Sequence, residues 1–194
     1  LLFRPLPGYM DADRVRNGIS AGKDVDGITD LSMSGVFSGS GTGYPPCPAQ
    51  ACIEILDHYS IDITGRKAAV IGRSLVAGRP VSMLLLERNA TVTICHTGTK
   101  DMAAVCREAD ILVVSAGRAG MIGRGCLREG QVVIDVGINV REDGTICGDV
   151  DYAEACRTAG AVTPVPGGVG AVTTAVLASH VVAAAECAFR KMRF

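Results

Sequence analysis

The sequence predicts an α/β fold, a doubly wound parallel sheet together with part of a second α/β domain. From residue 66 onward, short apolar runs alternate with helix-like segments, which is the rhythm of βαβ units. The apolar runs are nearly continuous, as expected for strands that are covered on both faces. The chain also has 24 glycines, 4 Phe, 4 Tyr and no Trp. This composition indicates many tight turns and close backbone approaches, and it suits a nucleotide-binding protein better than an aromatic-rich interface protein.

Length and charge narrow the function classes. The 194 residues correspond to one domain, or one domain and part of another. With 19 Lys+Arg against 20 Asp+Glu and a net charge of −1, the chain has no strong attraction for nucleic acid or for an anionic membrane. We therefore expect no nucleic-acid partner and no membrane partner. The total charge does not test for a local basic patch, which is the alternative.

The spacing of the cysteines and the two ends of the chain indicate the cellular compartment that we expect for the protein. The eight cysteines show no CxxC spacing, so we expect small core residues in a reducing compartment, no metal site and a cytoplasmic location. No signal-peptide pattern is visible, and polar residues interrupt the apolar stretches 109–116 and 171–188. The opening residues 3–7 resemble the end of a buried strand, so we expect a preceding segment.

Residues 1–59 are predicted to be the C-terminal part of the second domain, followed by an interdomain helix. A short helix is expected at 11–19, and a Ser/Gly-rich loop at 32–43. A second helix is predicted at 49–59, because Cys52, Ile55, Leu56 and Tyr59 share one face at helical spacing.

Residues 60–165 are predicted to form a Rossmann-like dinucleotide domain. Strands are expected at 67–72, 91–95, 110–115 and 131–137, and helices at 80–88 and 100–109. Residues 166–194 are then expected to return to the first domain, through a long Ala/Val-rich helix at 172–190.

The turn after the first predicted strand is a candidate phosphate site. Gly72 permits a tight turn, and Gly78 permits close packing before a helix whose N-terminus offers free N–H donors. Gly72, Arg73 and Ser74 are therefore candidate cofactor-binding residues. The sequence is not GxGxxG, so an ordinary βα turn is the alternative.

The end of the next strand favours NADP over NAD. NAD-binding folds place an acidic residue there for the ribose 2′-hydroxyl, whereas this chain has His96 and Thr97. Arg73 can bind a 2′-phosphate in a forked geometry. Ile138, after the fourth strand, is expected beside the nicotinamide. A surface histidine and a plain strand end are the alternatives at these positions.

Several sequence blocks, taken together, resemble the bifunctional methylenetetrahydrofolate dehydrogenase/methenyltetrahydrofolate cyclohydrolase family. They occur in the family's order over nearly the whole chain and are KDVDG (23–27), VIGRS (70–74), ATVTICH (90–96), IDVGIN (134–139), GDV (148–150) and TPVPGGVG (163–170). The last block is long and distinctive, and we identify the chain as a member of this family.

The resemblance implies an NADP-dependent oxidation of 5,10-methylenetetrahydrofolate and hydrolysis of the product to 10-formyltetrahydrofolate, within one-carbon metabolism and purine biosynthesis. It implies that Gly72, Arg73 and Ser74 bind the cofactor phosphates, that Thr97 assists at the adenosine side and that Ile138 contacts the nicotinamide. It further implies a homodimer formed through the dinucleotide domain.

The resemblance also implies the folate-binding residues. Asp26 would accept N–H bonds from the pterin, whereas Asp24 would be structural. The segment 164–170 would line the folate cleft, which makes Pro164, Gly167, Gly168 and Val169 candidate substrate-binding residues.

The chain departs from the family pattern at several positions. Phe3 stands where the family commonly has Gln, and Ala171 and Val172 replace the usual Pro and Met. The family's catalytic Lys and its Tyr lie in a segment before Phe3, so we expect no catalytic residue within this chain. A non-catalytic NADP- or folate-binding relative is the first alternative, and another dinucleotide enzyme of the amino-acid or shikimate type is the second.

Overall fold

The computed structural model describes residue 2 and residues 6–191 of the chain. Its helices are α1 (Ala12–Asn17), α2 (Asp30–Ser38), α3 (Cys47–His58), α4 (Gly78–Glu87), α5 (Met102–Glu108), α6 (Tyr152–Thr158) and α7 (Val169–Lys191), with short 3-10 turns η1 (Ala21–Lys23) and η2 (Arg124–Cys126). Its strands are β1 (Lys67–Ile71), β2 (Thr91–Cys95), β3 (Ile111–Val114), β4 (Val132–Asp135), β5 (Asn139–Val140), β6 (Ile146–Cys147) and β7 (Ala161–Val162).

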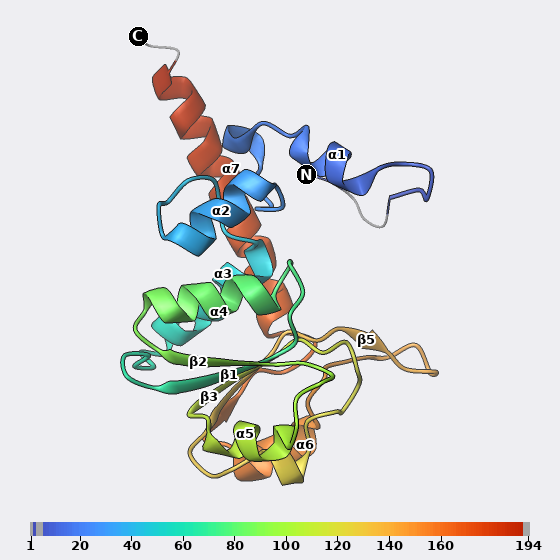
Figure 1. The fold of residues 1–194 in the computed structure, drawn as a ribbon. Coiled ribbons are helices and arrows are strands. Elements are labelled where there is room, and N and C mark those ends of the chain that lie inside the picture. Colours follow the sequence, from blue (N-terminus) through green and yellow to red (C-terminus); the bar gives the residue numbers. More distant parts are fainter. Residues whose placement is uncertain (1, 3–5, 192–194) are drawn as a thin grey trace.

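A five-stranded parallel sheet in the order β2-β1-β3-β4-β7 forms the centre of the fold. In Figure 1, α3, α4 and α7 cover one face of this sheet, and α5 and α6 cover the other. The predicted fold class is confirmed. Chain order reverses between β1 and β3, and this reversal is the point where open α/β sheets bind their ligands.

The centre of the sheet is buried on both faces, which explains the continuous apolar runs of β1, β3 and β4. Along β1, Ala68 and Val70 belong to the core shared with α3, α4 and α7, whereas Ala69 and Ile71 belong to the core beneath α5 and α6. This alternation follows from the two-residue period of a strand. The central strands β1, β3 and β4 are covered on both faces and carry no polar alternation, whereas the edge strand β2 has Thr91 and Thr93 exposed.

The predicted loop at 32–43 is wrong, because its first half is helix α2. Thr29 caps the helix, its Oγ1 accepting the Ser32 amide at 3.2 Å. A Cβ on Gly35 would overlap the carbonyl oxygen of Thr42, so this glycine permits close packing inside a helix. Gly39 then ends the helix in a left-handed conformation. Tertiary packing overrides the weak helix propensity of the Ser and Gly residues.

The other predicted elements are found with boundaries shifted by a few residues. α4 and α7 begin earlier than expected, at Gly78 and Val169. The hairpin β5–β6, helix α6 and edge strand β7 are additional, and the three strands have two residues each. Such short strands show no recognisable period. The predicted strand end at 3–7 lies mostly outside the described residues.

Within the described chain, one helix is long and apolar enough to cross a membrane by length and composition. It is α7, where an 18-residue window within Val169–Arg190 has a mean hydropathy of 1.5 and 11% of that window is buried. Core helices of globular proteins pass the same test. Val169, Val176 and His180 of α7 are buried, so the first half of this helix is part of the protein's own packing.

Candidate active site at the carboxyl edge of the sheet

The turn after β1 is shaped by glycines, as predicted. Gly72 has φ +119°, and a Cβ there would overlap the carbonyl oxygen of Ser115, which follows β3. A Cβ on Gly78 would overlap the carbonyl of Gly72 itself. At both glycines, backbone atoms of neighbouring residues therefore leave no room for a side chain. These contacts bring the start of α4 close to the crevice between β1 and β3.

The register of the sheet brings the predicted cofactor residues to one edge. Ile71 pairs with Cys95 of β2, and the Gly72 amide donates to the Cys95 carbonyl at 2.9 Å. Arg73, two residues after β1, and His96, the first residue after β2, therefore lie in the turns at two neighbouring strand ends. Arg73, Ser74, His96 and Thr97 are all exposed, which leaves these side chains accessible to a ligand.

His96 is held by its own turn. Its amide donates to Thr99 Oγ1 at 2.8 Å, and its Nδ1 accepts the Gly98 amide at 3.1 Å. A neutral ring in this arrangement carries its proton on Nε2. This nitrogen can donate to a ligand.

A cavity of about 420 Å³ lies at the topological switch point. Of the predicted residues, Ser74, Ile138 and Val169 line it. The remaining lining residues are Pro48, Val76, Ala77, Ser115, Gly117, Val136, Gly137, Gly170 and Thr173. Sequence reasoning passed over Ser115, although it ends a predicted strand of the same sheet and such positions face the ligand edge.

A buried carboxylate, Asp149, fixes the loop that borders this cavity. Its oxygens accept the amides of Ala116, Gly117 and Arg118 at 2.6, 2.8 and 2.8 Å, and the Asn139 side-chain amide at 2.8 Å. The loop after β3 and the start of the β5–β6 hairpin are thus tied to one residue. Three successive amides on one carboxylate make a rigid wall, because charged hydrogen bonds are strong and geometrically defined.

The predicted pterin ligand, Asp26, sits on a turn that Asp24 organises. Asp24 is buried and accepts the Ile28 amide at 3.0 Å, the Thr29 amide at 2.8 Å and the Ser32 hydroxyl at 2.6 Å. Burial alone would raise the pKa of Asp24, but these hydrogen bonds hold it below its usual value. The structural role expected for Asp24 is confirmed.

Gly27 fixes the same turn from the other side. It has φ +68°, and a Cβ there would overlap the backbone of residues 44–46. Only glycine fits both the conformation and the contact. Asp26, between Asp24 and Gly27, is half-buried on a turn with little freedom.

Cys47 connects the Asp26 turn to the cavity. Its Sγ lies 3.4 Å from the Val25 carbonyl oxygen, and the next residue, Pro48, lines the cavity. Burial, with the nearby charge of Asp26, raises the pKa of the Cys47 thiol to about 11. The thiol is therefore protonated at neutral pH and acts as a weak donor.

The candidate residues of the segment after β7 do not all line the same cavity. Pro164 lines a second cavity of about 470 Å³, together with Asp135, Arg141 and Tyr152. A Cβ on Gly168 would overlap the Pro164 carbonyl, so this glycine packs against its own segment. Gly167 has φ +102°. Of the four candidates, Val169 alone, the first residue of α7, lines the cavity at the switch point, and the next residue of the segment, Gly170, lines it too.

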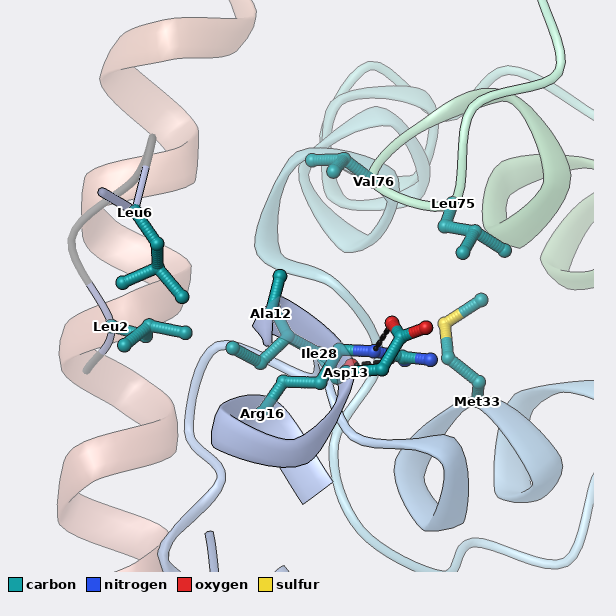
Figure 2. A pocket seen from close by; sticks show the side chains of 9 residues that line it. All are labelled: Leu2, Leu6, Ala12, Asp13, Arg16, Ile28, Met33, Leu75 and Val76. Carbon is teal, nitrogen blue, oxygen red and sulfur yellow. Dashed lines mark hydrogen bonds and ion pairs between the residues drawn. The ribbon is translucent and has the colours of Figure 1, made fainter. Parts of the chain in front are cut away.

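A third cavity, of about 440 Å³, adjoins the first through Val76, which lines both. Figure 2 shows Leu75 and Val76 of the β1–α4 turn on one side of it, and Leu2 and Leu6 on the other, beside α7. Its lining is apolar apart from Asp13 and Arg16, which form an ion pair at 2.9 Å. Apolar surface thus extends from the switch point toward the N-terminal residues.

Comparison with known proteins identifies the family. The family model for "Tetrahydrofolate dehydrogenase/cyclohydrolase, NAD(P)-binding domain" matches residues 46–189. The chain belongs to this family. A "Bifunctional protein FolD" of Clostridioides difficile is 48% identical over 186 residues, which make up 96% of this chain and 65% of that relative. The chain thus spans about two thirds of the curated relatives that it matches.

Solved structures of the family have the same fold. The bifunctional FolD methylenetetrahydrofolate dehydrogenase/cyclohydrolase of Campylobacter jejuni superposes with a TM-score of 0.92 at 39% identity, covering 94% of this chain and 65% of that one. The Trypanosoma brucei enzyme, described as complexed with NADP cofactor and inhibitor, gives 0.90 at 32% identity, covering 97% and 66%. The resemblance inferred from the sequence blocks is confirmed.

Proposed function

We propose that the protein oxidises 5,10-methylenetetrahydrofolate with NADP and hydrolyses the methenyl product to 10-formyltetrahydrofolate. The observation that carries this proposal is the cavity at the β1/β3 switch point. It joins a βα phosphate turn on one side to the Asp26 turn on the other, through Cys47 and Pro48. One cavity thus adjoins the phosphate turn directly and the Asp26 turn through Cys47 and Pro48.

The cofactor half of the proposal uses the exposed edge of the sheet. Gly72, Arg73 and Ser74 would bind the phosphates of NADP, with Arg73 pairing with the 2′-phosphate. His96 and Thr97, at the neighbouring strand end, would contact the adenosine side. Ile138 is 69% exposed and lines the cavity, which supports its contact with the nicotinamide.

In the folate part of the proposed site, the Asp26 carboxylate would accept two N–H groups of the pterin at once. Val169 is supported as a further contact, because it lines the same cavity. Gly167 and Gly168 remain proposed through the resemblance alone. Pro164 has less support, since it lines the second cavity.

The binding residues would act in catalysis by positioning the folate and the cofactor. NADP, held by Gly72, Arg73 and Ser74, would supply the acceptor for the hydride that leaves the methylene carbon when the methenyl cation forms. The loop fixed by Asp149 and the Asp26 turn would hold the methylene carbon of the folate close to the nicotinamide carbon that takes the hydride. Proximity of this kind lowers the activation barrier of hydride transfer. Water then adds to the cation and the ring opens, a step for which we propose a catalytic Lys outside the 194 residues.

The activity is tested by following NADP reduction at 340 nm with 5,10-methylenetetrahydrofolate and the protein encoded by the complete gene. A rate that is linear in enzyme concentration is expected. A rate no higher than background, with folate and NADP both still binding, would favour a non-catalytic relative instead.

We also propose a cytoplasmic homodimer in one-carbon metabolism and purine biosynthesis, formed through the dinucleotide domain at residues 60–165. The folate-side part would be 1–59, and 166–194 would return to it. The exposed apolar side chains of Val140 and Ile146 on the β5–β6 hairpin support a contact through this domain. Light scattering after size exclusion distinguishes a dimer from a monomer.

A further inference from the structure

His180 ties the C-terminal helix to the turn that carries Asp26. It lies on α7, is 8% exposed, and its Nδ1 is 2.9 Å from the carbonyl oxygen of Val25, 155 residues away in the sequence. A carbonyl only accepts, so we assign the proton to Nδ1, which donates to Val25 and also lies 3.7 Å from the Cys47 Sγ. The ring of Tyr44 lies 4.8 Å from the imidazole and helps to hold it.

Asp24 and Gly27 do not hold the Val25 carbonyl. This carbonyl is held by side chains from other elements. Asp24 holds the amides of Ile28 and Thr29, and Gly27 packs against residues 44–46. The Val25 carbonyl accepts from His180 and from the Cys47 thiol at 3.4 Å. A thiol is a weak donor, so the imidazole is the stronger of the two.

The peptide unit that contains this carbonyl also contains the Asp26 amide, because a peptide group is planar. Rotation of the Val25 carbonyl therefore turns the backbone of Asp26 and redirects its carboxylate. The first residues of α7, Val169, Gly170 and Thr173, line the cavity. His180 thus links the helix that borders the cavity to the orientation of Asp26.

We propose that His180 is a positioning residue for folate binding, which acts by holding the Val25–Asp26 peptide through its Nδ1–H. This inference rests on the proposed function, since it requires Asp26 to bind the pterin. His180 touches neither substrate nor cofactor in this proposal. Loss of one such hydrogen bond should weaken folate binding about three- to tenfold and leave NADP binding unchanged.

Two variants separate the hydrogen bond from the packing. His180→Phe keeps a ring against Tyr44 but removes the donor, whereas His180→Asn keeps a side-chain N–H close to the position of Nδ1. His58→Phe is the matched control, because His58 is exposed near the end of α3. In the full-length protein, dissociation constants for tetrahydrofolate and for NADP are measured by calorimetry, and hydrogen exchange is followed in residues 23–29.

The expected result is weaker tetrahydrofolate binding and faster exchange in 23–29 for His180→Phe, both restored to within about twofold by His180→Asn. NADP affinity and the His58→Phe control should match the wild type. Unchanged folate affinity in His180→Phe would overturn the inference while leaving the proposed function intact. A parallel loss of folate and NADP affinity in both variants would also overturn it, because it would indicate general destabilisation. Absence of tetrahydrofolate binding by the wild type would instead overturn the proposed function, and the inference with it.

Discussion

Gly148 lies directly against the carboxylate of Asp135, so closely that a Cβ on the glycine would overlap the acid's oxygens. Asp135 itself accepts the amides of Gly137, Asp149 and Val150 at 2.9, 3.1 and 2.9 Å. The carboxyl end of β4 is thus locked to the segment that supplies Asp149. This relationship explains why a buried acid, whose pKa is raised by burial, ends a strand in the core.

Gly148→Ala should destabilise the protein by about 1–3 kcal/mol, because the added methyl group overpacks a site with no free space. Urea unfolding followed by circular dichroism measures the change. Gly125→Ala is the control, since a Cβ there has no neighbour within 4 Å. Equal stability of the two variants would contradict the proposed overlap.

Arg73→Ala should weaken NADP binding roughly ten- to hundredfold and change NAD binding by less than about threefold, because only NADP carries the 2′-phosphate. Fluorescence titration with each cofactor measures the ratio. Arg79→Ala on the neighbouring α4 is a matched control, since Arg79 is also exposed. Equal losses for both cofactors would rule out the 2′-phosphate role.

Asp26→Ala should weaken tetrahydrofolate binding roughly ten- to hundredfold and leave NADP binding within about twofold, because it removes a charged acceptor from one ligand only. Calorimetry with each ligand tests this. Lys23→Ala, an exposed change in the same segment, should have little effect on either ligand. A lower melting temperature with equal loss of both ligands would show that Asp26 is structural.

Asp24 should make folding stability depend on pH on the acid side. Its pKa is lower in the folded state than the ordinary value of 3.8, so the unfolded chain binds the proton more readily. The stabilisation is therefore present above the unfolded pKa and is lost as pH falls through the folded pKa. Unfolding free energies from pH 7 down to pH 2 should decline less steeply in Asp24→Asn. Asp62→Asn, at an exposed site, should keep the wild-type slope.

The sheet was predictable from sequence because each long strand is an apolar run bounded by turn residues. β1 is an example, and its pairing with β2 brings the turns that carry Arg73 and His96 to the same edge of the sheet. Ser74, Ile138 and Val169 were singled out and do line one cavity. Whether these residues bind the expected ligands stays a prediction.

Other features depend on contacts between distant segments. Helix α2 is rich in Ser and Gly and is stabilised by the Thr29 cap and by packing at Gly35, which no local pattern shows. Pro164 shares a motif with Val169 but faces another cavity, since the chain turns between them. His180 could not be recognised from sequence, because its partner lies 155 residues away.

The position of α7 has a thermodynamic consequence. Its first turn borders the space proposed for nicotinamide and pterin, and about two turns beyond Thr173 it carries the donor that holds the Asp26 turn. A rigid displacement of this helix would change both ligand sites at once. If binding at one site moves the helix, linkage requires the two ligands to change each other's affinity by the same factor.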